Sequence, residues 1–474
     1  MAGKALNKAN LIALGEETLA ELLLEAVKGD AARQRRVRLV LAADQGPEAI
    51  AMDVRKRFAT IRKGRSYISR KKQRVLAKEL AELTEMIEAR IAEADPNLAF
   101  ELLWEQLHLA HGIYQRTDDA WSAIRDVMTQ AMDAVARVTP SMSKPAEDLA
   151  EDVFDAVVSD VFGTFEYGVR AVSEALGTAG LKRLKTLASE AAEAPAPEAE
   201  IALYAVLTGA SRSEARAKAA RQRRLHLLLQ DLADLEGDVD AWLDQFTEAQ
   251  LVSPTVAPAA ADRLRLAGRA EEALGLVLEA RSRDNGRDRP DLDEAYFACL
   301  DALGRKDDLQ EALWQRFETH LCPDALQRHL KLLPDFDDIE AADRARAHVL
   351  AYRPIAPALL YSQRAQDMTL AAQLVMERHT EIDGEAYELL SPLAEGLEAH
   401  HPLAAVVIWR SMIDFALRKG RSARFGHAVK HLESCATADM QIVDYQGHPT
   451  HFDYVEGLRR NHGRKAAFWE RLDP

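Results

Sequence analysis

A dense run of basic residues near the N-terminus is the strongest chemical signal in the sequence. Between Arg33 and Lys78, 15 of 46 residues are Lys or Arg against three acids, although the whole chain has a formal net charge of −15. Arg70, Arg74 and Lys78 are spaced i, i+4, i+8, which predicts a basic stripe along one helix face. Such a stripe can neutralise the phosphates of a nucleic acid or the carboxylates of a protein. The candidate binding residues are Arg55, Arg62, Arg70, Lys71, Arg74 and Lys78.

Three interpretations of this basic segment stay open. It is a solvated helix face, or it docks on an acidic protein surface of this chain or of a partner, or it binds nucleic acid. Phe58 shares a helical face with Val54 and Ile61, so we expect it in the core and not as a base-stacking platform. We favour the acidic protein surface and keep nucleic acid as the alternative.

Histidines near the C-terminus are weak candidates for a metal site. His427, His431 and Cys435 are spaced i, i+4, i+8 on one predicted helix, and two histidines at i and i+4 can share a zinc ion. Positions i and i+8 lie about 12 Å apart on a helix, which excludes Cys435 from that ion. His448 or His451 would have to complete the site. Ordinary packing and capping histidines are the simpler interpretation, so we assign no metal or other cofactor.

Signatures of known catalytic sites are missing from the sequence. It contains no GxxxxGK phosphate loop, GxGxxG, HExxH, GxSxG or CxxC motif. The many acids of the chain show no isolated pair that would suit acid–base chemistry. We therefore expect a protein that is not an enzyme.

Length and composition narrow the class of protein. At 474 residues the chain exceeds what one hydrophobic core supports, so we expect two or three domains or a repeat array. No uncharged apolar run reaches the length of a membrane span, and Glu16, Glu17 and Glu21 interrupt any signal peptide. Three scattered cysteines argue against a disulfide framework. We expect a cytoplasmic protein that has no contact with membranes.

Helical periodicity dominates, and the predicted fold class is all-α. Leu76, Leu80, Leu83 and Ile87 recur at helical spacing, and the pair Asp95-Pro96 predicts the end of that helix. Alternating strand patterns are almost absent. The helices are short and follow one another through short loops, which favours antiparallel packing.

A Pro- and Glu-rich stretch suggests a division of the chain. Residues 193–200 read EAPAPEAE and predict an extended linker between a basic N-terminal helical domain, residues 1–192, and a second domain, residues 201–474. Turns at Gly268 and Gly304 lie 36 residues apart, close to the 34-residue period of tetratricopeptide repeats. We predict a helical bundle or hairpin domain followed by an α-solenoid-like, tetratricopeptide-like array. A bundle with coincidentally spaced turns is the alternative.

The C-terminal segment carries the most distinctive pattern. His451 to Trp469 reads HFDYVEGLRRNHGRKAAFW, which resembles the tail of an uncharacterised bacterial family of helical proteins and is similar to that of bacterial SWIM zinc-finger proteins. The block Arg35-Arg36-Val37-Arg38-Leu39 extends the first resemblance to the N-terminus. The SWIM zinc motif, Cys-x-Cys followed by Cys-x-His, is absent, so the resemblance implies a helical adaptor region and no zinc chemistry.

We expect the tail to form a capping helix for the array. The same tail would present a small basic edge made of Arg459, Arg460, Arg464 and Lys465. The sequence thus predicts a non-catalytic, cytoplasmic helical scaffold that mediates protein–protein interaction with an unidentified partner. The alternative is a nucleic-acid-associated protein that binds phosphates through residues 55–78.

Overall fold

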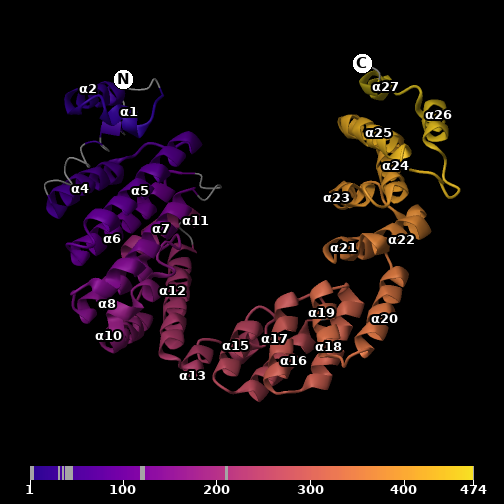
Figure 1. Cartoon of the computed structure of the whole chain (residues 1–474). Helices are drawn as coiled ribbons and strands as arrows, with labels where there is room; N and C mark the ends of the chain where they lie inside the picture. Colours follow the sequence, from indigo (N-terminus) through magenta and orange to yellow (C-terminus); the bar gives the residue numbers. More distant parts are fainter. Residues whose placement is uncertain are drawn as a thin grey trace. The chain divides into compact units, whose positions relative to one another are not determined.

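The protein is helical throughout the part of the chain that the structure describes. A computed structural model describes residues 5–29, 33–34, 37, 46–117, 123–208, 212–284 and 286–472, and these ranges contain helices and turns but no strand (Figure 1). The predicted all-α class is confirmed. Arg35, Arg36, Arg38 and Leu39, which extend the basic segment and the family resemblance, lie outside the described residues.

The chain divides into two compact units, Met1–Thr247 and Glu248–Pro474. The helices of unit 1 are α1 (Lys8–Ile12), α2 (Glu16–Val27), α4 (Pro47–Lys63), α5 (Arg70–Arg90), α6 (Pro96–Tyr114), α7 (Ala123–Val138), η1 (Thr139–Ser141), α8 (Ala146–Ser159), α9 (Gly168–Ala171), α10 (Ser173–Glu193), α11 (Glu198–Thr208), α12 (Ser213–Glu236) and α13 (Val239–Leu243). Residues 193–200, which the sequence predicts as a linker, lie within this unit.

Unit 2 begins with α14 (Glu248–Leu251). It continues with α15 (Ala257–Leu266), α16 (Ala270–Arg283), α17 (Pro290–Ala302), α18 (Lys306–His320), α19 (Pro323–Leu332), α20 (Asp337–Ala351), α21 (Ile355–Arg364), α22 (Met368–Arg378), η3 (His379–Glu381), α23 (Tyr387–Glu398), α24 (Pro402–Arg418), η4 (Ser422–Arg424), α25 (Phe425–Asp439), α26 (His451–His462) and α27 (Ala466–Leu472).

Local signals in the sequence set the ends of helices. α6 starts at Pro96, which fits the first helical turn because that position needs no amide hydrogen bond. The side chain of Asp95 caps the helix by accepting a hydrogen bond from the amide of Leu98 at 2.9 Å. α5 itself ends earlier, at Arg90, and a turn over residues 91–94 leads to this pair.

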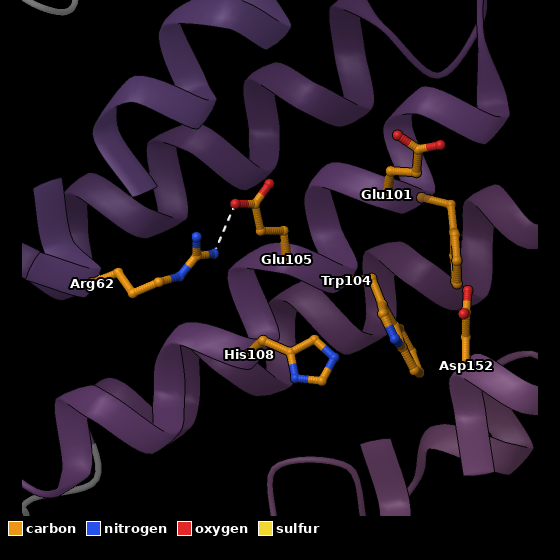
Figure 2. A pocket seen from close by; sticks show the side chains of 7 residues that line it. Arg62, Glu101, Trp104, Glu105, His108 and Asp152 are labelled. Carbon is orange, nitrogen blue, oxygen red and sulfur yellow. Dashed lines mark hydrogen bonds and ion pairs between the residues drawn. The ribbon is translucent and has the colours of Figure 1, made fainter. Parts of the chain in front are cut away.

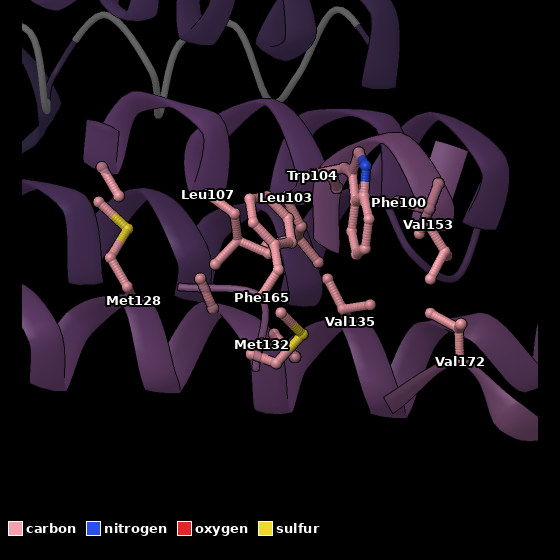
Figure 3. Close-up of a cluster of buried hydrophobic side chains, with 14 of the residues drawn as sticks. Phe100, Leu103, Trp104, Leu107, Met128, Met132, Val135, Val153, Phe165 and Val172 are labelled. Carbon is pink, nitrogen blue, oxygen red and sulfur yellow. The ribbon is translucent and has the colours of Figure 1, made fainter. Parts of the chain in front are cut away.

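The core of unit 1 is built from the apolar faces of α4 to α10 and α12. Phe100 and Trp104 of α6 stack with their ring centroids 5.2 Å apart, and Phe165 meets Trp104 edge-on at 4.9 Å (Figure 3). Met128 and Met132 of α7 belong to the same buried cluster, in which Met132 lies below Phe165 (Figure 3). The predicted core position of Phe58 is confirmed, because its side chain is fully buried.

Unit 2 is an array of packed helix pairs. α15 packs on α16 and α17, α17 on α18, α18 on α19, and the same near-neighbour pattern continues through α24 and α25. Gly268 and Gly304 adopt φ angles of 79° and 67° between α15 and α16 and between α17 and α18, a conformation that glycine adopts without strain. Contacts restricted to neighbouring pairs are typical of solenoids. The closer likeness to tetratricopeptide repeats stays a prediction.

The chain ends on two short helices that pack on α25. Leu458 of α26 and Phe468 of α27 are both buried in the core of unit 2. The tail for which the sequence predicts one capping helix thus contains two. Within the described ranges, no helix combines the length and the apolar character that a membrane crossing needs.

Candidate functional site

The basic segment forms the exposed faces of α4 and α5. On α4, Ile50, Val54, Phe58 and Ile61 are buried on one side, which turns the basic residues of the helix outward. On α5, buried leucines at positions 76, 80 and 83 fix the orientation in the same way. Helical periodicity therefore separates an apolar face from a basic face in both elements.

Two of the predicted binding residues are held by ion pairs within the unit. Arg55 Nη2 lies 2.7 Å from a carboxylate oxygen of Glu101. Arg62 Nη2 lies 2.8 Å from a carboxylate oxygen of Glu105 (Figure 2). Both acids belong to α6. The charges of Arg55 and Arg62 are therefore largely compensated, which favours docking on the chain's own acids for this part of the segment.

A pocket beside these pairs combines acids with aromatic rings. Glu101, Glu105 and Asp152 line it together with Trp104 and His108 (Figure 2). Burial and the nearby guanidinium of Arg62 lower the pKa of His108. The three carboxylates pair with Arg55, Arg62 and Lys144. Since the charges cancel locally, the pocket offers no net charge to a ligand.

Four cations of α5 are different, because their side chains are exposed and form no ion pair among the described residues. Lys71, Lys72, Arg74 and Lys78 are exposed, and no carboxylate in the described part of the chain lies within 4 Å of them. Arg70 is exposed on the same helix. The structure thus places the predicted stripe of Arg70, Arg74 and Lys78 at the surface.

A groove of about 540 Å³ runs between α4 and α5 beside the exposed cations. Its apolar lining comes from Ile61, Ile68, Val75 and Leu76. Val75 is 56% exposed, although it is a large aliphatic residue. The one signal in the sequence that could have indicated this groove is a valine, Val75, between basic residues of a predicted helix.

The rim of the groove is basic, and hydrogen bonds hold two of its basic residues, Arg57 and Arg116, in place. Lys71 and Lys72 line it on α5. Arg57 makes two hydrogen bonds of 2.7 Å to the carboxylate of Glu79, which ties α4 to α5. Arg116 donates to the carbonyl oxygens of Gly112 and Ile61 at 2.8 Å and 3.1 Å. These contacts fix the guanidinium groups of Arg57 and Arg116 beside the groove.

The C-terminal basic residues form a smaller and looser group. Arg459 and Arg460 are exposed at the end of α26, and Arg464 is exposed in the following turn, where Lys465 is half-buried. The guanidinium of Arg459 lies 5.2 Å from the ring centroid of Trp469, as in a cation–π contact.

The histidines do not gather into a metal site. His427 is exposed on α25, and burial lowers the pKa of its neighbour His431. His448 packs against His379 with ring centroids 4.8 Å apart, and Nδ1 of His451 is buried without a hydrogen-bond partner. Across the residues that the structure describes, no three His, Cys, Asp or Glu side chains are placed to hold a metal ion together.

A buried polar cluster lies between α24, α25 and α26, and the sequence analysis does not predict it. Arg410 is 6% exposed, donates to the carbonyl oxygen of Pro449 at 2.6 Å, and lies 4.5 Å from the ring centroid of Tyr454. The hydroxyl of Tyr454 donates to Asp414 at 2.8 Å. Burial raises the pKa of Cys435 to about 12. A thiol that stays protonated is a poor nucleophile, so this cluster is suited to packing and not to covalent chemistry.

Fold and surface together define an all-helical protein of packed helix pairs with a basic, partly apolar groove. The chain belongs to the Family of unknown function (DUF6880), whose sequence pattern matches residues 1–471. No curated protein matches the chain. A solved structure described as a circular tandem repeat protein with novel repeat topology and enhanced subunit contact surfaces is similar at 15% identity, over 98% of this chain and 94% of that one, with a TM-score of 0.14.

Proposed function

We propose that the protein is a non-catalytic helical scaffold that binds an acidic segment of a partner protein through α4 and α5. The observation that carries this proposal is the set of exposed cations Lys71, Lys72, Arg74 and Lys78 on α5, which form no ion pair among the described residues and lie beside a groove with an apolar lining. A cationic rim favours carboxylates, and an apolar floor favours aliphatic side chains. An acidic amphipathic segment meets both requirements.

The aliphatic lining of the groove favours a protein over a nucleic acid. Sites for single-stranded nucleic acid use aromatic rings on which bases stack, and Phe58 of the basic segment is buried. One observation supports the nucleic-acid alternative, since Tyr67 is 62% exposed in the turn between α4 and α5. The alternative therefore predicts that Tyr67 contributes to binding, whereas the scaffold proposal does not.

Two further features fit a scaffold that works in the cytoplasm. Cys299, Cys322 and Cys435 are all free thiols, which suits a reducing compartment. The similarity of the C-terminal tail to that of bacterial SWIM proteins supports an adaptor region at this end, with the basic edge as a second contact surface.

The proposal is tested by comparing two ligands across a salt series. A labelled, designed amphipathic helix of leucine and glutamate and a labelled single-stranded DNA are titrated with the full-length protein. We expect the peptide to bind and the double variant Lys71→Glu/Lys72→Glu to weaken it at least tenfold. The matched control, Lys182→Glu/Lys218→Glu, makes the same charge change at exposed positions of unit 1 away from the groove. DNA binding that needs Tyr67, with no peptide binding, would replace the proposal by its alternative.

A further inference from the structure

The N-terminal helix α2 (Glu16–Val27) has the composition that the groove requires. Its sequence, EETLAELLLEAV, contains four glutamates and no basic residue. Leu19, Leu22, Leu23 and Ala26 lie at i, i+3, i+4 and i+7, which is one face of a helix. The helix is therefore both acidic and amphipathic.

Three of the four leucines of α2 are exposed in the part of unit 1 that the structure describes. Leu22, Leu23 and Leu24 are 45%, 47% and 68% exposed, and Val27 is the one buried residue of the helix. No residue of α2 belongs to the hydrophobic core of unit 1 as far as the described residues define it. Contiguous exposed leucines of this kind mark interaction surfaces.

The dimensions of α2 and of the groove agree. Leu19 to Ala26 span about 10 Å along a helix, and the groove residues of α5, from Lys71 to Glu79, span about 12 Å. Two turns of α2 therefore suffice to place leucines over Val75 and Leu76 while glutamates reach the lysines of the rim.

We infer that α2 of a second copy of this chain occupies the α4–α5 groove. Leucines of the visiting helix cover Val75 and Leu76, and its glutamates pair with Lys71 and Lys72. Two copies exchange their helices reciprocally, because each carries both a helix and a groove, which gives the closed, symmetric contact that homodimers favour. This inference rests on the proposed function, since it uses the same groove, and it makes self-association compete with the binding of an acidic partner.

A charge-swap experiment tests the exchange between copies. The variant Glu21→Lys/Glu25→Lys reverses the charge of α2, and Lys71→Glu/Lys72→Glu reverses that of the rim. We expect the wild-type chain to dimerise in analytical ultracentrifugation at low salt and each variant alone to dimerise at least tenfold more weakly. An equimolar mixture of the two variants restores dimers, because each reversed helix then meets a groove of opposite charge. The control Glu93→Lys/Glu174→Lys, at exposed acids of unit 1, leaves the wild-type dimer unchanged.

Several results would overturn the inference. A wild-type chain that stays monomeric up to 100 µM would do so, as would dimers that neither variant weakens or a mixture in which dimers do not return. All substituted side chains are exposed, and circular dichroism of each variant verifies that the helices are intact. Self-association that the swap leaves untouched would point to a different interface.

A peptide experiment separates this inference from the proposed function. A labelled peptide of residues 14–29 is titrated with the full-length Glu21→Lys/Glu25→Lys variant, whose own helix no longer competes for the groove. We expect binding that Lys71→Glu/Lys72→Glu abolishes and that Leu19→Asp/Leu23→Asp in the peptide weakens at least tenfold. If the designed leucine–glutamate helix binds the groove but the peptide of residues 14–29 does not, the inference fails and the proposed function stands. If neither binds, both fail.

Discussion

The ion pair between Arg57 and Glu79 ties α4 to α5 beside the groove, and its removal lowers the stability of this contact measurably. We predict that Arg57→Met loosens the contact between α4 and α5 while the rest of unit 1 keeps its stability. The pair has bidentate geometry with two 2.7 Å hydrogen bonds, and the two side chains are only 21% and 16% exposed. It is therefore neither a surface pair nor a fully buried one.

The free energy lost on breaking the pair can be estimated from this partly buried position. Breaking a fully buried pair on one side costs about 3–5 kcal/mol, whereas exposed pairs contribute about 0.2–1 kcal/mol. For partly exposed partners we expect about 2 kcal/mol, which corresponds to a local opening about 30-fold more frequent. Since Met keeps much of the aliphatic stem of Arg57 and most of its packing, the loss reports mainly on the charge and its hydrogen bonds.

Native-state hydrogen exchange of the full-length protein resolves this local effect, because it reads the opening of individual helices. We expect amide protection in α4 and α5 to fall about 30-fold in Arg57→Met, on the arithmetic above. The double variant Arg57→Met/Glu79→Met recovers part of the loss, because it also removes the partly buried carboxylate that has lost its guanidinium partner. The control is Arg183→Met, since Arg183 pairs with Glu151 at 34% and 55% exposure and a surface pair has little effect. Unchanged protection in Arg57→Met, or a double variant that is less protected than Arg57→Met, would contradict this prediction.

Two further predictions concern the polar cluster of unit 2. Burial raises the pKa of the Cys435 thiol to about 12, so iodoacetamide at pH 8 should leave Cys435 unmodified in the folded protein and alkylate it in urea. Peptide mass mapping detects the difference. Fast labelling of Cys435 in the native protein would contradict this prediction. Burial also raises the pKa of Asp414 above its usual value of 3.8, so ionisation of this carboxyl opposes folding. The resulting loss of folding free energy is absent below pH 3.8 and grows as pH rises toward the pKa of the folded state. The free energy of unfolding of Asp414→Asn relative to wild type should therefore increase between pH 4 and 7, and a flat difference in urea titrations would contradict this sign.

Helical periodicity carried most of the fold prediction because it is a local property of the sequence. The spacing of Leu76, Leu80 and Leu83 and the pair Asp95-Pro96 define α5 and the start of α6, and both elements are present. The burial of Phe58 also follows from its position on one helix face. Such features depend on residues a few positions apart, which is the range over which a sequence pattern is informative.

The state of each basic residue could not be predicted in the same way, because it depends on distant parts of the chain. Arg55 and Arg62 are paired with acids more than 40 residues away, while Lys71 and Lys72 have no such partner among the described residues. One charged run in the sequence therefore separates into a compensated half on α4 and an exposed half on α5. The groove itself arises from the packing of two helices and has no contiguous sequence signature.

The C-terminal cluster was missed for the same reason. The regular spacing of His427 and His431 suggests a shared site. The buried polar contacts of this region instead involve Arg410, Tyr454 and Asp414, which belong to two helices more than 30 residues apart. The sequence signal for these contacts is Arg410 inside the apolar run of α24, since charged residues are rarely buried without partners.

Direct competition between an acidic helix and a nucleic acid tests the central claim, that the α4–α5 groove binds an acidic protein segment. The labelled leucine–glutamate helix is bound to the full-length protein and then challenged with single-stranded DNA at about 0.15 M salt, where interactions between distant exposed charges are largely screened. The account predicts that the helix stays bound and that Lys71→Glu/Lys72→Glu releases it. Displacement by DNA at low concentration, or binding of the helix that ignores this double substitution, would contradict it.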